Sequence, residues 1–424
     1  MNNTIERVQL TLAKRHRSEK IFRAFGIISI LFGLMCLVIV FADIFGKGLS
    51  AFLETRIQLQ VELDSAELDI SDVNDQQQLE TADYEAVVRN SIRARFPNVN
   101  GRRERRDLSA LISGDAPYQV RDFLTANPQA LDSTQTFWVL ADDDIDTYVK
   151  SRGDEDGAFT GRLNAAQIEW VETLIQDENL RREFNTTFFT ASASSEPEQS
   201  GILGAALGSL FTLVVCLVLS FPIGVAAAIY LEEYAQKNRI TDLIEVNINN
   251  LAAVPSIIFG LLGLAIFINL FGMPRSVPLV GGLVLALMTL PTIIIASRAA
   301  IQAVPPSIRE AALGIGASKM QMILHHVLPL AMPGMLTGTI IGMARALGET
   351  APLLMIGMFA FIVDLPSGPF DPATVLPVQI YLWADSPERA FIERTSAAII
   401  ILITFLTVMN GVAVWLRKRL ERRW

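Results

Sequence analysis

Cysteine and histidine are almost absent from this sequence, whose 424 residues include two cysteines and three histidines. Cys36 and Cys216 both lie in apolar runs and belong to no metal-spaced set, so neither a zinc site nor a disulfide framework is expected. Buried packing is the predicted role of both thiols. The chain also lacks the GxxxxGK[ST] pattern of a P-loop, so we predict no bound cofactor and no ATP site of that kind.

Charge is scarce and unevenly distributed. Charged residues make up 19% of the chain and hydrophobic residues 51%. Residues 47–198 contain 29 acidic and 15 basic side chains, whereas the remainder contains 15 acidic and 20 basic ones. This segregation predicts an acidic soluble block inserted into a basic membrane scaffold.

Six apolar segments are long enough to cross a bilayer, which needs roughly 20 residues of helix. The predicted spans are 23–45, 202–231, 246–271, 277–297, 330–363 and 396–416. The first follows a basic arm and resembles a signal peptide. It is too long for a signal-peptide core and no small-residue cleavage site follows it, so a retained anchor is expected. The fold class is therefore an all-α polytopic membrane protein with six transmembrane helices and one inserted soluble domain.

Lysine and arginine near the span ends predict the orientation. Both termini are basic, and six spans place both on one side, so a multi-pass protein of the inner membrane with cytoplasmic termini is expected. The loop 232–245 contains four acidic and two basic residues, so its charge does not support the predicted cytoplasmic placement. The predicted organisation is a basic arm, a first transmembrane helix, a periplasmic domain, a core of five transmembrane helices with a cytoplasmic loop at 298–329, and a basic tail: 1–22, 23–45, 46–200, 201–416 and 417–424.

The periplasmic domain is predicted to be α+β. Residues 57–63 alternate like a strand, 79–96 and 164–184 have helical patterns, and 192–200 reads as a polar linker. Its acidic cluster consists of Asp142, Asp143, Asp144 and Asp146. The cluster lacks the glycine-turn spacing of a calcium loop, so a solvated acidic turn is the preferred interpretation over a cation site, and no metal site is predicted. The role of the domain stays open.

The polar loop between the fourth and fifth spans has strong helix signals. Pro305-Pro306 stops a preceding helix, and Ser307-x-x-Glu310 matches a capping box, so a short helix is predicted over 308–315. Gly314 and Gly316 permit a left-handed turn at its end. A second short helix is expected from a cap at Ser318 to His326.

A family resemblance in this loop is carried by Glu310, Ala311, Ala312, Gly316, Ala317, Leu328 and Pro329. Their spacing resembles the EAA loop of binding-protein-dependent ABC transporter permeases. His326 departs from the usual aliphatic residue of that pattern. The resemblance implies a coupling helix, beginning near Ser307, that fits a groove in a separate ATP-hydrolysing subunit, so the chain itself is not expected to be an enzyme.

The fifth predicted span contains Arg345 and Glu349. Inserting a charged side chain into the bilayer costs at least about 2.5–3.5 kcal/mol, so a charged pair at this depth is expected to have a structural or functional role. Their i, i+4 spacing allows them to pair, and the same broad face carries Gly334, Gly338 and Gly342, which let another helix approach closely. Two interpretations stay open: a structural ion pair that locks helices, or an arginine that holds an oxyanion with its fork of donors.

Two segments, 344–354 and 253–263, resemble the PstA-type permeases of phosphate ABC importers, a likeness that covers 201 to the end. It implies a translocation pathway near Arg345, Glu349, Thr350, Pro255 and Ser256. Kinking and packing are equally good interpretations of the last two. The implied partners are a second permease, an ATPase dimer, a periplasmic phosphate-binding protein and inorganic phosphate.

The expected function is therefore the permease subunit of an ATP-driven phosphate importer. An importer of sulfate or molybdate is the alternative within the same class. A membrane sensor would need a cytoplasmic output domain, for which the predicted cytoplasmic tails are too short. A secondary transporter often shows repeated span patterns, and none is evident.

Overall fold

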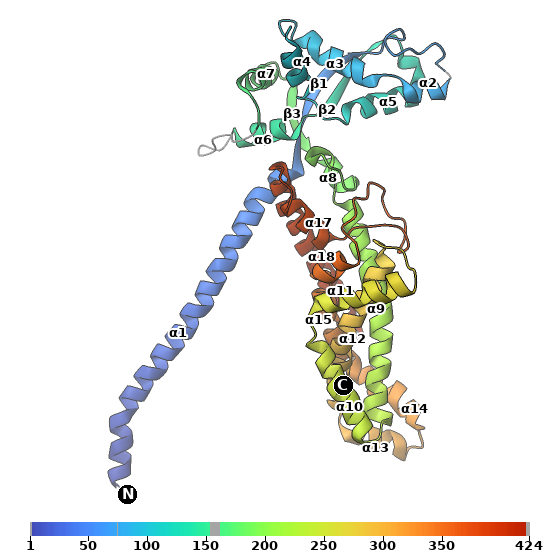
Figure 1. The fold of residues 1–424 in the computed structure, drawn as a ribbon. Helices are drawn as coiled ribbons and strands as arrows, with labels where there is room; N and C mark the ends of the chain where they lie inside the picture. The colour runs from blue at the N-terminus through green and yellow to red at the C-terminus, as the bar shows by residue number, and fades with distance from the viewer. Residues whose placement is uncertain (1, 74, 153–161, 421–424) are drawn as a thin grey trace.

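The computed structural model describes residues 2–73, 75–152 and 162–420. Three parts are visible in Figure 1: a long N-terminal helix, an inserted domain (residues 49–200), and a helical core (residues 201–420). Arg422 and Arg423 of the predicted basic tail lie outside the described residues. The inserted domain lies at one end of the core, and the segment between the fourth and fifth predicted spans lies at the other.

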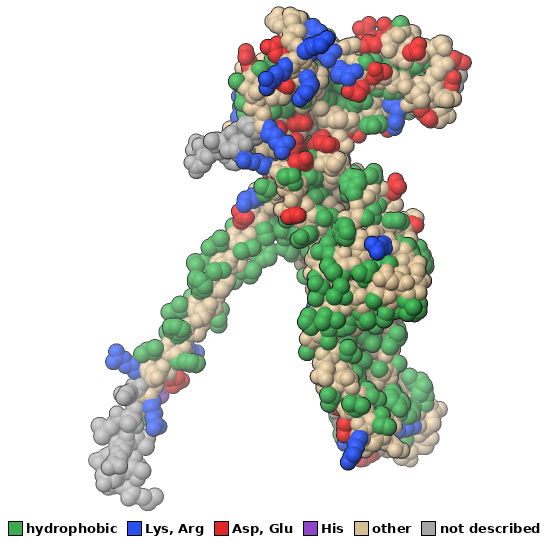
Figure 2. Space-filling view, in the orientation of Figure 1, with side chains coloured by type: hydrophobic (Ala, Val, Ile, Leu, Met, Phe, Trp, Pro, Cys, Tyr) green, Lys and Arg blue, Asp and Glu red, His purple; other side chains and the backbone are tan. Residues whose placement is uncertain are grey.

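Helix α1 (Asn2–Gly48) contains the first predicted span and stands away from the core along most of its length (Figure 1). Its candidate membrane segment buries none of its residues within this chain. Cys36 is exposed on this helix, so the expectation that it packs in a core is wrong, whereas Cys216 is buried as predicted. Figure 2 shows the apolar side chains of α1 and of the core, with the charges gathered mainly on the inserted domain. An apolar helical segment that buries none of its residues within its own chain must be covered by lipid or another protein.

The inserted domain is built on a three-stranded antiparallel sheet in the order β2-β1-β3. The strands are β1 (Leu53–Glu62), β2 (Thr134–Leu140) and β3 (Leu180–Phe184), and Ile57 of β1 pairs with Val139 on one side and Leu180 on the other. The helices around the sheet are α2 (Gln76–Thr81), α3 (Tyr84–Arg95), α4 (Arg102–Ser109), α5 (Ala116–Ala126), α6 (Asp143–Ser151), α7 (Ala165–Gln176) and α8 (Thr186–Thr190). Alternate residues of β1 enter one hydrophobic core, in agreement with the predicted strand.

The helical pattern predicted over 164–184 is only partly right. Helix α7 ends at Gln176, and Glu178 adopts a left-handed conformation with φ 57°. The chain therefore reverses and continues as β3. Neither glycine nor proline marks this turn, and the only local signals are the turn-forming residues Asp177 and Asn179 on either side of Glu178.

Within the described residues, α1 and four helices of the core are long and apolar enough to cross a membrane, and the number rises from five to six when one bent pair is counted as a span. The longest members of the core are α9 (Leu203–Ile229), α12 (Pro278–Gln302), α15 (Leu328–Leu347) and α18 (Ala390–Leu420). The shorter helices are α10 (Arg239–Ala252), α11 (Ser256–Gly263), α13 (Pro306–Gly314), α14 (Lys319–Met322), α16 (Ala351–Met355) and α17 (Leu376–Ala384).

Two predicted spans are not continuous helices. The segment 246–271 is broken at Pro255, where α10 and the following helix meet at 100°. The segment 330–363 ends its helix at Leu347, and only the short α16 follows. Proline removes a backbone donor and disfavours a helical residue before it, which explains the first break. Hydropathy alone does not report either interruption.

Helices α12 and α15 pack at very short range through the glycine face of α15. A Cβ atom added at Gly338 would lie 2.1 Å from Cβ of Ala296, and one at Gly334 would lie 2.7 Å from Cβ of Ala300. Hydrogen in place of a side chain is therefore required where these two helices cross.

Replacing Gly338 with alanine should destabilise the chain by about 1–3 kcal/mol, because the added methyl forces α12 and α15 apart. Gly411→Ala is the matched control, since no atom lies within 4 Å of a Cβ at that helical glycine. Thermal unfolding of both purified variants measures the effect. A melting temperature of Gly338→Ala equal to that of Gly411→Ala would contradict the close packing.

Candidate functional site: a helix pair at one end of the core

Helices α13 and α14 form a compact polar segment, here called the coupling block (residues 305–327), at the end of the core opposite the inserted domain (Figure 1). Helix α13 begins at Pro306 with Pro305 as its N-cap. Gly316 adopts φ +90°, which is the left-handed turn predicted after the first helix. The second helix does not stop near His326, because it continues without a break into α15.

The capping box predicted at Ser307 is wrong. Proline suits the first turn of a helix, so α13 starts upstream and leaves Ser307 inside it, without a side-chain cap. A capping box forms instead at Ser318, whose hydroxyl accepts from Gln321 N at 3.3 Å while Ser318 N donates to Gln321 Oε1 at 2.9 Å. The cap therefore stabilises the second helix rather than the first.

Three residues of the predicted Glu310-Ala311-Ala312 motif lie on different faces of α13. Ala312 is buried against Ile323 and Val327, so it anchors the helix to the core. The side chain of Glu310 is exposed. Ala311 borders an apolar groove of about 500 Å³, which is lined by Ile308, Ala311, Ala312, Ile315, His325, His326, Pro329 and Leu330. Leu328 packs partly buried beside the cluster that contains Ala312. The block thus presents an exposed carboxylate and, lined by other residues, an apolar groove.

The contacts that hold the coupling block come from residues that the sequence analysis did not select. Arg309 Nη2 lies 3.0 Å from Glu233 Oε1, and its Nη1 and Nη2 donate to the carbonyl oxygens of Val304 and Ile301 at 2.6 and 2.8 Å. Glu233 lies in the turn at the end of α9 and its side chain is 8% exposed. The neighbouring Glu232 pairs with Arg298 of α12 at 2.6 Å. The sequence offered one signal for these ion pairs, namely two adjacent glutamates that follow an apolar run.

Replacing Glu233 with alanine should lower the free energy of unfolding by about 3 kcal/mol, because it leaves the guanidinium of Arg309 without its carboxylate. The exposed pair of Arg121 and Asp122 supplies the control, since Asp122→Ala removes a surface contact worth under about 1 kcal/mol. Thermal unfolding of the purified variants checks both values. Equal melting temperatures for the two variants would show that the ion pair of Arg309 and Glu233 contributes no more stability than an exposed pair.

The second predicted site lies at the far end of α15. Arg345 Nε is 3.4 Å from Glu349 Oε1, and the arginine side chain is 53% exposed whereas the glutamate is 18% exposed. The helix ends two residues before Glu349, and Thr350 precedes α16. The guanidinium is thus lightly held and open on one side within this chain.

The structure brings together the two segments that carry the resemblance to phosphate permeases. Helix α11 packs against α16, and a Cβ at Gly260 would lie 2.6 Å from Cα of Pro352. Pro255 and Ser256 lie at the bend where α11 begins. The residues predicted to line a pathway therefore lie in or beside two helix interruptions of the core, with Arg345 in the last turn of α15. In membrane proteins, irregular backbone is tolerated where it is buried in protein or lines a cavity.

A separate group of ionisable side chains lies where the inserted domain meets the core, here called the junction. Burial and the charge of Asp143 raise the pKa of Asp142 to about 8. Burial and the charge of Asp144 raise the pKa of Asp143, and burial raises the pKa of Glu198. The expectation of a solvated acidic turn is wrong, because these aspartates begin helix α6 and are half-buried.

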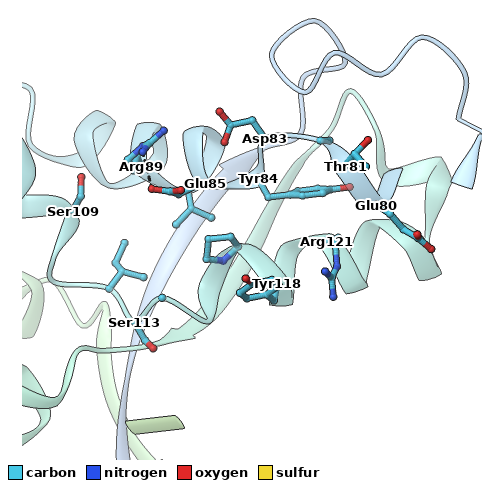
Figure 3. A pocket seen from close by; sticks show the side chains of 15 residues that line it. Glu80, Thr81, Asp83, Tyr84, Glu85, Arg89, Ser109, Ser113, Tyr118 and Arg121 are labelled. Atoms are coloured by element: carbon cyan, nitrogen blue, oxygen red, sulfur yellow. Dashed lines mark hydrogen bonds and ion pairs between the residues drawn. The ribbon is translucent and has the colours of Figure 1, made fainter. Parts of the chain in front are cut away.

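A groove of about 630 Å³ lies in the inserted domain, and none of its lining residues belongs to either predicted site (Figure 3). Its charged side chains pair locally: Glu85 with Arg89 at 2.7 Å, while the guanidinium of Arg121 lies 5.1 Å from the centre of the Tyr118 ring. The hydroxyl of Tyr84 donates to the carbonyl of Leu79. Both arginines that line this groove therefore already have carboxylate partners, Glu85 for Arg89 and Asp122 for Arg121.

Comparison with known proteins assigns the helical core to a family. Residues 220–423 match the family described as binding-protein-dependent transport system inner membrane component, and residues 9–158 match a domain of unknown function, DUF3333. The phosphate transport system permease protein PstA 1 of Mycobacterium tuberculosis is 33% identical over 229 residues, which are 54% of this chain and 74% of that protein. This chain belongs to the binding-protein-dependent inner membrane component family.

Other relatives of this permease differ in name. The probable ABC transporter permease protein YqgI of Bacillus subtilis is 30% identical, across 54% of this chain and 82% of that protein. The phosphate transport system permease protein PstC of Haemophilus influenzae is 29% identical, across 51% and 76%. Among solved structures, the MetNI methionine ABC transporter in inward-facing form aligns with a TM-score of 0.42 at 18% identity, covering 51% of this chain and 95% of that one.

The permease is thus a non-catalytic transmembrane subunit of a binding-protein-dependent ABC importer. It is a multi-pass inner membrane protein that works with an ATPase subunit and a binding protein. The resemblance inferred from the coupling loop and from the segments around Pro255 and Arg345 is confirmed at the level of the family.

Proposed function

We propose that this permease carries inorganic phosphate and forms the translocation pathway together with a second permease subunit. The observation that carries the proposal is the half-exposed guanidinium of Arg345 at the end of α15, beside the packed α11 and α16 segments. Arginine offers planar donors that match the oxygens of phosphate. Glu349 would orient the guanidinium in the absence of phosphate and would repel the anion as it passes. The relatives named for phosphate transport, at about 30% identity, favour the same substrate.

The coupling block is the proposed docking surface for the ATPase. Its exposed Glu310 and its apolar groove lie at the end of the core away from the inserted domain, which supports a cytoplasmic block and an external domain. The domain limits 46–200 and 201–416 and the cytoplasmic placement of both termini belong to this proposal. The N-terminal end of α1 and the C-terminal end of α18 both point toward the end that carries the block (Figure 1).

Movement of the ATPase would reach the pathway through one continuous helix. The second helix of the coupling block runs directly into α15, which ends at the segment of Arg345 and Glu349. The ion pair of Arg309 and Glu233 ties the same block to the end of α9. A rigid displacement of the block is therefore expected to shift α15 relative to its neighbours and to alternate access to the pathway.

Uptake of radiolabelled phosphate and sulfate tests the substrate directly. Vesicles containing the permease, its second permease and the ATPase would be supplied with ATP inside and the binding protein outside. We expect phosphate uptake that depends on ATP and that a tenfold excess of sulfate does not reduce. Preferential uptake of sulfate or molybdate would leave the importer assignment intact and overturn phosphate as the substrate.

A further inference from the structure

Helix α4 of the inserted domain carries a cluster of arginines, here called the arginine patch, which consists of Arg102, Arg103, Arg105 and Arg106. The segment 47–198 has 29 acidic and 15 basic side chains, and four of those basic residues fall within these five consecutive positions. All four arginine side chains are exposed. Figure 2 shows Lys and Arg side chains gathered over the part of the domain where Figure 1 places α4. A domain that is acidic overall therefore presents a strongly positive surface at this helix.

The other residues of α4 are held by the domain itself. Gly101 N donates to Glu104 Oε2 at 3.3 Å, which caps the start of the helix. Asn164 Nδ2 donates to Asp107 Oδ2 at 3.0 Å, and Leu108 is fully buried in the hydrophobic core of the domain. Both acidic side chains of α4 thus have partners outside the patch. The helix is fixed in place while its arginines point into solvent.

The arginines of the patch have few contacts of their own. Arg105 donates to the carbonyl oxygen of Val99 and to Asn100 Oδ1, both at 3.2 Å. Other arginines of the domain have carboxylate partners: Arg89 with Glu85, Arg95 with Asp177, and Arg121 with Asp122. Within the described part of the chain, no arginine of the patch forms an ion pair. Their charge is therefore available to another molecule.

The position of the patch works against the stability of its own helix. The N-terminal end of a helix carries a partial positive charge, and the patch begins at the first residue of α4. Arg102 precedes Arg105 by three residues and Arg106 by four, the spacings at which like charges on a helix repel each other. Charges that weaken their own helix and have no acidic partner in the domain indicate that the compensating negative charge comes from a binding partner.

The place of α4 in the molecule selects that partner. Helix α4 lies on the side of the inserted domain away from the core (Figure 1), so the patch does not face the lipid around the core. The coupling block, where the ATPase is proposed to dock, lies at the opposite end of the chain. Of the partners of a binding-protein-dependent importer, the soluble binding protein is the one that approaches from the aqueous side. Arginine suits such a surface, because it is enriched at protein interfaces and its fork of donors matches carboxylates.

We propose that the arginine patch is a docking surface for an acidic face of the binding protein. The proposal rests on the external placement of the inserted domain in the proposed function, and it does not depend on which anion is transported. Complementary charge raises the rate at which two proteins meet, and the effect weakens as salt screens it. The inserted domain would thus hold the binding protein near the core and shorten its search for the entrance to the pathway.

The association rate of the purified binding protein with the full-length permease tests the patch. The permease would be assembled with its second permease and the ATPase in lipid nanodiscs. Replacing both Arg103 and Arg106 with glutamate should lower the association rate constant at least about tenfold at low ionic strength. The difference should shrink between about 0.01 M and about 0.15 M salt, over which the screening length falls from about 30 Å to about 8 Å.

Matched variants separate the patch from general effects of charge and folding. Arg103→Lys combined with Arg106→Lys keeps the charge and should keep most of the association rate. Arg182→Glu reverses an exposed arginine of β3 and should change the rate less than about twofold. The double glutamate variant should melt at the same temperature as the unmodified protein or higher, because negative charge suits the start of a helix.

The side of the membrane is measured separately from association. Labelling of Arg103→Cys by an impermeant maleimide in right-side-out vesicles, against the unmodified protein as background, should show an external domain. Unchanged association of the double glutamate variant, or an equal loss in Arg182→Glu, overturns the docking surface even if the domain is external. An internal domain overturns the placement in the proposed function and this inference together. Patch-dependent association in a complex that imports sulfate would overturn phosphate as the substrate and support the docking surface.

Discussion

Reversing the charge of Glu310 to lysine should abolish ATP-driven uptake while leaving the permease folded and inserted. Glu310 projects from α13 with its side chain exposed, so the substitution disturbs little within this chain. The neighbouring Ala312, which anchors α13, stays in place. A carboxylate that contacts the ATPase would be replaced by a like charge or an unpaired one, which costs several kcal/mol at a buried interface. Uptake in reconstituted vesicles is expected to fall at least about a hundredfold.

Three controls give this experiment its meaning. Asp242→Lys makes the same charge change in the first turn of α10 and should retain uptake, since it lies outside the coupling block. Glu310→Gln keeps the shape of the side chain and should lose less activity than the lysine variant. Pull-down of the ATPase should report weaker assembly for Glu310→Lys alone. Normal uptake by that variant at normal abundance would exclude Glu310 from coupling.

Replacing Arg345 with alanine should reduce phosphate uptake at least about tenfold, with assembly intact. The arginine side chain is half exposed and its single ion pair, at 3.4 Å, is long, so its removal should change stability by under about 1 kcal/mol. Losing a charge-assisted contact to an oxyanion costs about 1.5–3 kcal/mol, which exceeds the factor of ten. The initial rate of labelled phosphate uptake, normalised to assembled complex, measures the effect.

Two further variants distinguish substrate contact from a structural ion pair. Arg345→Lys retains the charge without the planar fork and should recover only part of the uptake. Glu349→Gln removes the partner of the same pair but no donor to phosphate, so it should transport better than Arg345→Ala. If both alanine and glutamine variants lose stability equally and transport equally, the pair is structural and the oxyanion role is wrong.

Much of the architecture follows from composition. Long apolar runs predict the spans because a membrane helix must be apolar over its length, and α9, α12 and α18 cover all but the end residues of the spans predicted for them. The errors lie where the backbone leaves the helix inside an apolar run. Pro255 bends one segment by 100°, and α15 stops at Leu347 although apolar residues continue. Hydropathy measures whether side chains prefer lipid or water. It does not indicate where the backbone stops being helical within an apolar segment.

The sequence by itself determined the family, the polar segment between the fourth and fifth predicted spans and the segregation of charge, because each depends on residues adjacent along the chain. Only the tertiary structure decided that Glu233 holds Arg309, and that Glu198 lines the same small cavity as Asp143. It also decided that the Gly260 and Pro352 segments touch. These pairs are separated by tens of residues, and their energies depend on burial that only packing creates. A carboxylate in water needs no partner, whereas the same group enclosed by two domains must find one.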